Sequence, residues 1–107
     1  MATTFTSAGR MSLPRIYADF NGTGPSPRRP ERLAVALDIR GSHEALARAG
    51  LELRDGLALT IWDASDETED LEADTVVYYH PNHRLWYAEM DENGYRYVAA
   101  VDRPLEA

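Results

Sequence analysis

Residues 75–90, TVVYYHPNHRLWYAEM, decide the fold that the sequence predicts. The first six of these residues are rich in β-branched and aromatic side chains, which favour strands. Pro81 and Asn82 fit the two central positions of a type I turn, because proline presets the backbone at the first of them. Leu85–Met90 then returns as a second strand. The stretch therefore predicts an antiparallel hairpin, from which the neighbouring strands can be placed.

Three further strands precede this hairpin in the predicted structure. Apolar and polar residues alternate over Arg15–Phe20, Arg32–Arg40 and Leu57–Trp62, and a two-residue period is typical of strands. Between the first two, Asn21–Glu31 is rich in Gly and Pro, which do not sustain regular pairing. We therefore expect a loop at residues 21–31.

One short helix is predicted at Ser42–Ala49. Ser42 is a good N-cap residue, and Gly50 suits the left-handed position that commonly ends a helix. In such an ending Leu46 and Leu51 form an apolar contact. A helix this short is not stable alone, so we expect it to dock on the sheet.

The chain after the hairpin predicts another turn and a last strand. The Asn-Gly pair inside Asp91–Gly94 is favoured in hairpin turns, so we expect a turn there and a strand at Tyr95–Val101. Six short strands with one helix predict a mainly β fold, either a small antiparallel meander or a partly open barrel. The domain is expected to span residues 15–101, between a disordered tail at residues 1–14 and a C-terminal tail at residues 102–107.

Part of the chain resembles known families. The run Leu51–Leu57, the acidic segment that follows it and the strand that carries Trp86 resemble short bacterial proteins of unknown function. The predicted strand arrangement, from Ile16 to Val101, resembles SH3-like small barrels. The first resemblance implies no activity, and the second implies binding rather than catalysis. No groove pattern for proline motifs is recognisable, so no peptide specificity is implied.

The amino-acid composition excludes several kinds of chemistry, because the 107 residues include no Cys and no Lys. Their absence excludes disulfides, thiolate nucleophiles, Schiff-base lysines and the Walker A phosphate site. Apolar runs are shorter than the ~18 residues of a membrane helix, and residues 1–14 lack the apolar core of a signal peptide. We therefore expect a cytoplasmic protein that is not an enzyme and binds neither a cofactor nor a membrane.

The negative charge is concentrated in one segment. The formal net charge is −7, and Asp63–Asp74 holds seven acids and no Arg, while the other eleven acids equal the eleven Arg. We expect this segment to be a solvated acidic loop that attracts a basic partner, or to lie beside Arg residues from the first half of the chain. A Ca²⁺ site is an alternative there, although the segment lacks the central Gly of an EF-hand.

Aromatic side chains in the second half of the chain predict an exposed patch. Neighbouring residues of a strand point to opposite faces, so each Tyr-Tyr or Trp-Tyr pair places one ring outward. We expect the outward rings and the acidic loop to bind another protein. A homodimer is a second expectation, because an open meander leaves edge strands to be covered. The predicted binding residues are Tyr78, Trp86, Tyr87, Tyr95, Asp66, Glu67, Glu69 and Asp70.

A metal site is an alternative function at the predicted turn. His80 and His83 are three residues apart, within the ~7 Å span of a β-turn, and imidazole is a common zinc ligand. A third ligand such as Glu89 or Asp91 would have to come from the hairpin. No sequence feature places one there.

Binding of single-stranded nucleic acid is the other alternative. Arg28, Arg29 and Arg32 cluster at the end of the Gly- and Pro-rich stretch, and Arg beside stacking aromatic rings is typical of such sites. Residues 55–107, however, carry thirteen acids and three Arg. This negative charge opposes binding to a phosphate backbone, so the sequence favours a protein partner.

Overall fold

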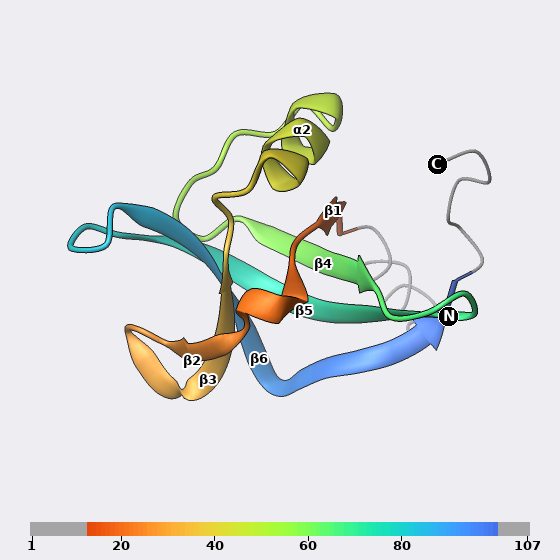
Figure 1. Cartoon of the computed structure of the whole chain (residues 1–107). Helices are drawn as coiled ribbons and strands as arrows, with labels where there is room; N and C mark the ends of the chain where they lie inside the picture. Colours follow the sequence, from red (N-terminus) through yellow and green to blue (C-terminus); the bar gives the residue numbers. More distant parts are fainter. Residues whose placement is uncertain (1–12, 101–107) are drawn as a thin grey trace, which may run out of the picture.

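A mixed sheet of six strands carries one α-helix on one of its faces in residues 13–100, the part of the chain that the computed structural model describes (Figure 1). The elements in chain order are β1 (Arg15–Tyr17), the 3-10 helix η1 (Phe20–Gly22), β2 (Gly24–Ser26), β3 (Arg29–Ala36), α2 (Arg40–Arg48), β4 (Ala58–Ala64), β5 (Glu69–His80) and β6 (Leu85–Ala99). The tails predicted at residues 1–14 and 102–107 lie outside the described residues, apart from Leu13 and Pro14. Within residues 13–100 no helix has the length and apolar character that crossing a membrane requires.

The order of the strands across the sheet is β1-β4-β5-β6-β3-β2, so the sheet is open, with β1 and β2 at its two ends. The consecutive strands β4, β5 and β6 form an antiparallel meander, and β3 pairs with the outer side of β6. β1 is parallel to β4, because the chain passes through η1, β2, β3 and α2 before it enters β4. The prediction of a mainly β fold with one short helix is confirmed, and the sheet adds one parallel pair to the predicted meander.

The hairpin predicted from residues 75–90 is present as the turn between β5 and β6. His80 and Leu85 are the last paired residues, and the Arg84 N–H donates to the His80 carbonyl over 2.8 Å. Arg84 itself has a left-handed backbone, with φ 56°. Both strands, however, continue well beyond their predicted outer ends.

The prediction of an acidic loop over residues 63–74 is wrong for most of its length, because β4 continues to Ala64 and β5 begins at Glu69. Beyond that residue the segment alternates between the two faces of the sheet, with Leu71 and Ala73 on the core side. Asp70, Glu72 and Asp74 stand at the alternate positions and face the opposite side, so their charges do not enter the core. Residues 65–68 form the turn between β4 and β5, and the Ser65 N–H donates to the Glu69 carbonyl over 3.1 Å.

The predicted hairpin turn at Asp91–Gly94 is also wrong, because β6 runs through these residues without reversing. Between the pairs Ala73–Tyr95 and Thr75–Met90, β6 advances five residues where β5 advances two. The three extra residues form an enlarged β-bulge, in which the glycine adopts a left-handed backbone with φ 68°. The Asn-Gly pair bends a long strand here, since the first half of β5 pairs with the residues that follow it.

The helix α2 begins two residues earlier than predicted and is anchored differently. Ser42 is not the N-cap, because its hydroxyl donates to the Tyr17 carbonyl of β1 over 2.7 Å and ties the helix to the sheet. The predicted ending is confirmed. Gly50 has φ 70°, and the Leu51 N–H donates to the Leu46 carbonyl over 2.9 Å, as in a Schellman motif.

The stretch at residues 21–31, predicted as a loop, contributes η1, β2 and the first residues of β3. Proline lacks an N–H, but an outer strand such as β2 tolerates it, because one side of that strand has no partner within residues 13–100. β1 is shorter than predicted because the chain turns into η1, where the Phe20 N–H donates to the Asp63 carboxylate over 2.9 Å.

The core lies on one face of the sheet and is built mainly from strand residues, together with Phe20 of η1 and Leu46 of α2 (Figure 1). Burial of each aliphatic side chain in such a core contributes about 1.5–3 kcal/mol. The core residues come from every layer of the fold and are Ile16, Ala18, Phe20, Val35, Leu37, Leu46, Leu57, Leu59, Ile61, Ala73, Val77, Ala88 and Met90.

The substitution Gly50→Ala is expected to lower the free energy of unfolding by about 1–2 kcal/mol, because a Cβ strains a left-handed residue. No atom lies within 4 Å of a Cβ built at this position, so the loss reports backbone strain. Urea unfolding followed by circular dichroism measures it. Gly22→Ala is the matched control, since that site is equally open and its φ is not positive. Equal losses in the two variants would contradict the role of Gly50.

Candidate functional site

The four predicted aromatic residues do not form one exposed patch. Tyr78 is 4% exposed, so it does not contact a partner directly, and Tyr87 stacks on it with ring centroids 5.6 Å apart. Trp86 packs against the core and against Tyr79. Tyr95 lies on the other half of β6 and is 46% exposed. Tyr95 is thus the exposed ring among the four.

The predicted acidic residues are divided in a similar way. Asp70 is 1% exposed and pairs with Arg15 of β1, with 3.2 Å between Asp70 Oδ2 and Arg15 Nη2. Asp66, Glu67 and Glu69 are exposed in or beside the turn between β4 and β5. Asp66 organises this turn, because its Oδ1 accepts two backbone N–H groups at 2.7 and 2.8 Å. The structure therefore buries one predicted acid and leaves three at the end of the sheet.

The acids on the outward face of β5 are bound by Arg residues of β1 and β6. Glu72 accepts hydrogen bonds from Arg15 Nε at 2.7 Å and from Arg96 Nη2 at 3.0 Å. Arg96 also donates to Asp74 at 3.2 Å. Burial acts against the charge of Arg96, but the hydrogen bond to Asp74 and the nearby carboxylates outweigh it and raise the pKa of Arg96. Much of the acidic segment is therefore neutralised within the sheet.

The C-terminal half of β6 has a free edge. β3 pairs with β6 at Tyr87–Glu89. After the bulge, residues 95–99 pair with β5 on one side and with no other strand of residues 13–100. Figure 1 shows this half of β6 bending away from β3 and running along the margin of the sheet. Among the described residues, this edge is a stretch of strand backbone with one side unpaired.

The direction of the backbone groups along this edge follows from one hydrogen bond. The Ala100 N–H donates to the Thr68 carbonyl over 2.9 Å, on the β5 side. Residues of an antiparallel strand alternate in the side to which their N–H and C=O groups point. The N–H and C=O groups of Tyr95, Tyr97 and Ala99 therefore point to the free side.

Two tyrosine rings stand beside the free edge. Tyr95 and Tyr97 are 46% and 58% exposed, and their ring centroids lie 6.4 Å apart. Tyr95 also packs edge-on against Phe20 at 6.3 Å, which fixes its ring from the core side. Where β3 and β6 part, a groove of about 380 Å³ opens between residues 31–33 and residues 91–95.

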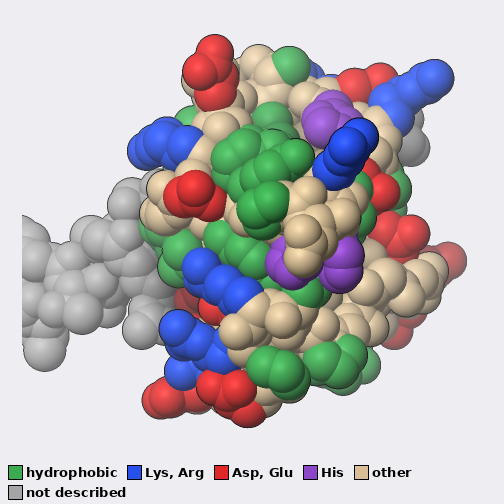
Figure 2. Space-filling model, turned by 90° about the vertical axis from the view of Figure 1, so that its left-hand side faces the viewer, with side chains coloured by type: hydrophobic (Ala, Val, Ile, Leu, Met, Phe, Trp, Pro, Cys, Tyr) green, Lys and Arg blue, Asp and Glu red, His purple; other side chains and the backbone are tan. Residues whose placement is uncertain are grey.

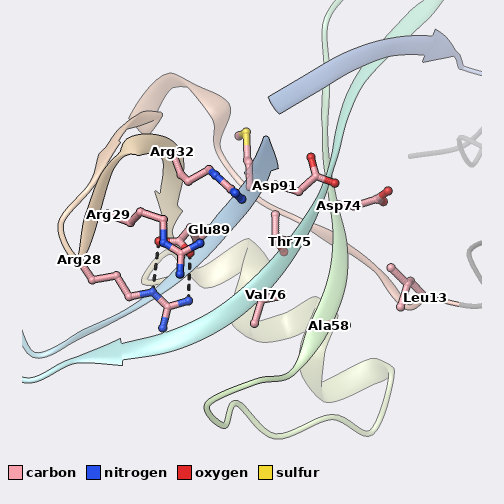
Figure 3. Close-up of a pocket in the computed structure, with 11 residues that line it drawn as sticks. Leu13, Arg28, Arg29, Arg32, Ala58, Asp74, Thr75, Val76, Glu89 and Asp91 are labelled. Carbon is pink, nitrogen blue, oxygen red and sulfur yellow. Dashed lines mark hydrogen bonds and ion pairs between the residues drawn. The ribbon is translucent and has the colours of Figure 1, made fainter. Parts of the chain in front are cut away.

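A second hollow, of about 390 Å³, lies beside the β2–β3 hairpin on the face of the sheet that α2 does not cover. Figure 3 shows three Arg side chains reaching into it from the hairpin toward β5, with two Asp side chains on the other side. Apolar side chains complete the lining. The residues that line it are Leu13, Arg28, Arg29, Arg32, Ala58, Asp74, Thr75, Val76, Glu89, Met90 and Asp91.

A buried polar network fixes the hairpin wall of this hollow. Ser26 Oγ donates to Glu89 Oε2 at 2.6 Å and lies 3.0 Å from Tyr78 Oη. Arg28 donates to both Glu89 oxygens, at 3.2 and 3.0 Å, and its guanidinium lies over the Tyr78 ring. Burial acts to raise the pKa of Glu89, but the hydrogen bonds from Arg28 and Ser26 outweigh burial and hold that pKa below its ordinary value.

The two histidines of the β5–β6 turn lie together, as predicted for the alternative metal site. The rings of His80 and His83 are 4.1 Å apart between centroids, and histidine side chains gather at the centre of the face in Figure 2. His80 Nδ1 accepts the His83 N–H at 3.2 Å, and His83 Nδ1 lies 2.7 Å from Tyr87 Oη. Within residues 13–100, no group of three or more His, Cys, Asp or Glu side chains is arranged to hold a metal ion.

Sequence reasoning missed parts of both candidate sites. Tyr97 shows only as one aromatic residue among several, and no sequence signal marks the strand edge on which it stands. The cluster of Arg28, Arg29 and Arg32 is visible in the sequence, but its partner Glu89 is about sixty residues away. That partner changes the chemistry of the cluster, because it binds one of the three guanidinium groups.

Comparisons with protein-family models, with curated proteins and with solved structures gave no significant match to this chain. The resemblance to short bacterial proteins and to SH3-like barrels therefore stays a prediction.

The substitution Glu89→Gln is expected to lower the free energy of unfolding by about 1–3 kcal/mol at neutral pH, because it removes the charge that Arg28 and Ser26 bind. The folded-state pKa of Glu89 is lower than its ordinary value of 4.5, so its contribution is present above that pH. The contribution is lost as the pH falls and the carboxylate is protonated. Urea unfolding between about pH 7 and pH 3 measures both effects.

The difference between the wild type and Glu89→Gln should therefore shrink in acid. Glu92→Gln is the matched control, because Glu92 is 80% exposed and should change stability by less than about 0.5 kcal/mol. A loss in Glu89→Gln that is the same at every pH would show that the charge of Glu89 is not what stabilises the hairpin.

Proposed function

We propose that the chain is a non-enzymatic protein-interaction module that binds an extended, basic segment of a partner protein along the free edge of β6. The observation that carries this proposal is the edge at residues 95–99, which pair with β5 and with no other strand of residues 13–100. Unpaired backbone groups on a sheet edge bind extended peptides by adding a strand. The interaction surface is thereby located at one end of the sheet.

The length of this edge supports the proposal. β1 and β2, at the two ends of the sheet, are each three residues long, and short outer strands are a common protection against unwanted pairing. The free part of β6 is longer, and it presents the outward N–H and C=O groups of Tyr95, Tyr97 and Ala99 in succession. A partner strand would pair with these three residues.

The side chains beside the edge support binding of a specific partner. Tyr95 and Tyr97 offer large exposed rings, and tyrosine is enriched in protein interfaces because it combines an apolar body with a polar tip. The groove between β3 and β6 adjoins Tyr95, so a partner strand paired there can place a side chain in it.

The charges around the edge favour a basic partner. Asp91 and Glu92 are exposed at one end of the edge, and Asp66 and Glu67 are exposed at the turn beside its other end. Arg96 lies between them, but it is bonded to acids of β5. Complementary charge speeds association and suppresses wrong partners.

A second copy of the chain fits this edge less well than a basic segment. An antiparallel self-pair centred on Tyr95 would place Asp91 of each copy opposite Ala99 of the other. That position adjoins the turn that carries Asp66 and Glu67, and like charges placed so close oppose pairing. We therefore favour a basic partner over the homodimer.

A short peptide of alternating Arg and Val, blocked at both ends, is expected to bind this edge of the full chain. In nuclear magnetic resonance spectra, the amide protons of Tyr95, Tyr97 and Ala99 should shift and exchange more slowly with solvent, because they acquire carbonyl acceptors. A matched peptide of alternating Glu and Val should bind at least about tenfold more weakly, because the acids around the edge repel it.

Two substitutions at one position separate the role of the backbone from that of the ring. Tyr97→Pro removes an N–H that points away from β5, so it blocks strand addition and leaves the β5–β6 ladder intact. Tyr97→Ala keeps the N–H and removes the ring. We expect no binding by the first variant and weakened binding by the second. Equal binding by both, or a dimer in sedimentation that Tyr97→Pro dissociates, would overturn the proposal.

A further inference from the structure

We propose that the hollow beside the β2–β3 hairpin binds a small organic acid, with its anionic group between Arg29 and Arg32 and its apolar body against Val76 of β5. This inference goes beyond the proposed function, because the hollow opens on the face of the sheet and needs no partner strand. Figure 3 shows the side chains of Arg29 and Arg32 pointing into the same space above Thr75 and Val76.

Arg28 is a fixed wall of this hollow rather than a ligand. Its Nε and Nη2 donate to the two oxygens of Glu89, and its guanidinium carbon lies 4.0 Å from the centre of the Tyr78 ring. Ser26 completes the set by donating to Glu89. These contacts hold the base of the hairpin, from which β3 projects the two other Arg side chains.

Arg29 and Arg32 hold the positive charge that remains. Arg29 forms no ion pair and no side-chain hydrogen bond with another residue of the described chain, and its charge acts on Glu89 only through space. Arg32 approaches Glu92 at 4.0 Å, but Glu92 is 80% exposed, and such a surface pair is weak. Guanidinium groups bind carboxylates and phosphates through parallel N–H donors, so two of them in one hollow form an anion site.

The other charges in the hollow leave a positive excess. Glu89 is neutralised by Arg28, and Asp74 is bonded to Arg96 at 3.2 Å. Asp91 remains on the side away from the hairpin. One anionic group at the hairpin side is therefore favoured, while Asp91 opposes a second one at the far side.

The size and floor of the hollow define the rest of the ligand. Its volume of about 390 Å³ lies within the range of small-molecule sites. Val76 is 43% exposed on this face of the sheet, and Ala58, Met90 and Leu13 add further apolar lining. The ligand class is thus a carboxylate or a phosphate carried on a short aliphatic or aromatic body.

Titration of the full chain with hexanoate, phenyl phosphate and the neutral hexanamide tests the inference. Nuclear magnetic resonance should show saturable shifts of the Arg29 and Arg32 side-chain N–H signals and of the Val76 methyl signals. Hexanamide should cause no saturable shift. Tighter binding of phenyl phosphate would identify the natural anionic group as a phosphate, and tighter binding of hexanoate would identify it as a carboxylate.

Charge-removing variants complete the experiment. Arg29→Gln and Arg32→Gln should each raise the dissociation constant at least about tenfold, whereas Arg48→Gln on α2 removes the same charge elsewhere and should leave it unchanged. Tyr97→Pro should bind the acid normally, which separates this inference from the proposed function. Equal binding of hexanoate and hexanamide, no binding of either acid, or no effect of the two variants would overturn it.

Discussion

The offset in pairing between β5 and β6 is the constraint on which both candidate sites depend. At Tyr87–Glu89, β6 lies between β5 and β3 and pairs with both strands. The extra residues before Tyr95 lengthen β6 relative to β5 and turn it away from β3. This departure creates the free edge and the groove between the strands. It also places Asp91 beside Arg32, and these two residues line both hollows.

The β2–β3 hairpin must be held at the point where the sheet divides, and buried polar groups hold it there. Glu89 is only 5% exposed, so its carboxylate has lost most of its contact with water. Three hydrogen bonds, one from Ser26 and two from Arg28, compensate for that loss. Arg29 and Arg32 extend from the same hairpin. The anion site therefore depends on a carboxylate that binds its own chain and leaves two guanidinium groups for a ligand.

Elements that depend on near neighbours could be predicted from the sequence. The β5–β6 turn follows from a Pro-Asn pair between two β-rich runs, and the end of α2 follows from Gly50 and Leu51. The first half of β5 could not be recognised in the same way, because its acids suggest a solvated loop. Leu71 and Ala73 do show the two-residue period of a strand. A segment with this period forms a strand only where a partner strand pairs with it, here the end of β6. The Asn-Gly pair likewise forms a bend in β6 rather than a hairpin turn, because the residues after it pair with β5.

The candidate sites were predictable only in part, because they depend on which strands pair over long distances. The sequence locates the whole charge excess in one segment, yet folding divides that segment. The part that belongs to β5 lies beside Arg15 and Arg96, which form ion pairs with Asp70, Glu72 and Asp74. The acids that stay exposed lie at the turn beside one end of the β6 edge, and Asp91 and Glu92 lie at the other end. The exposed part of the negative charge thus lies at both ends of this edge, which is why the proposed function assigns the edge a basic partner.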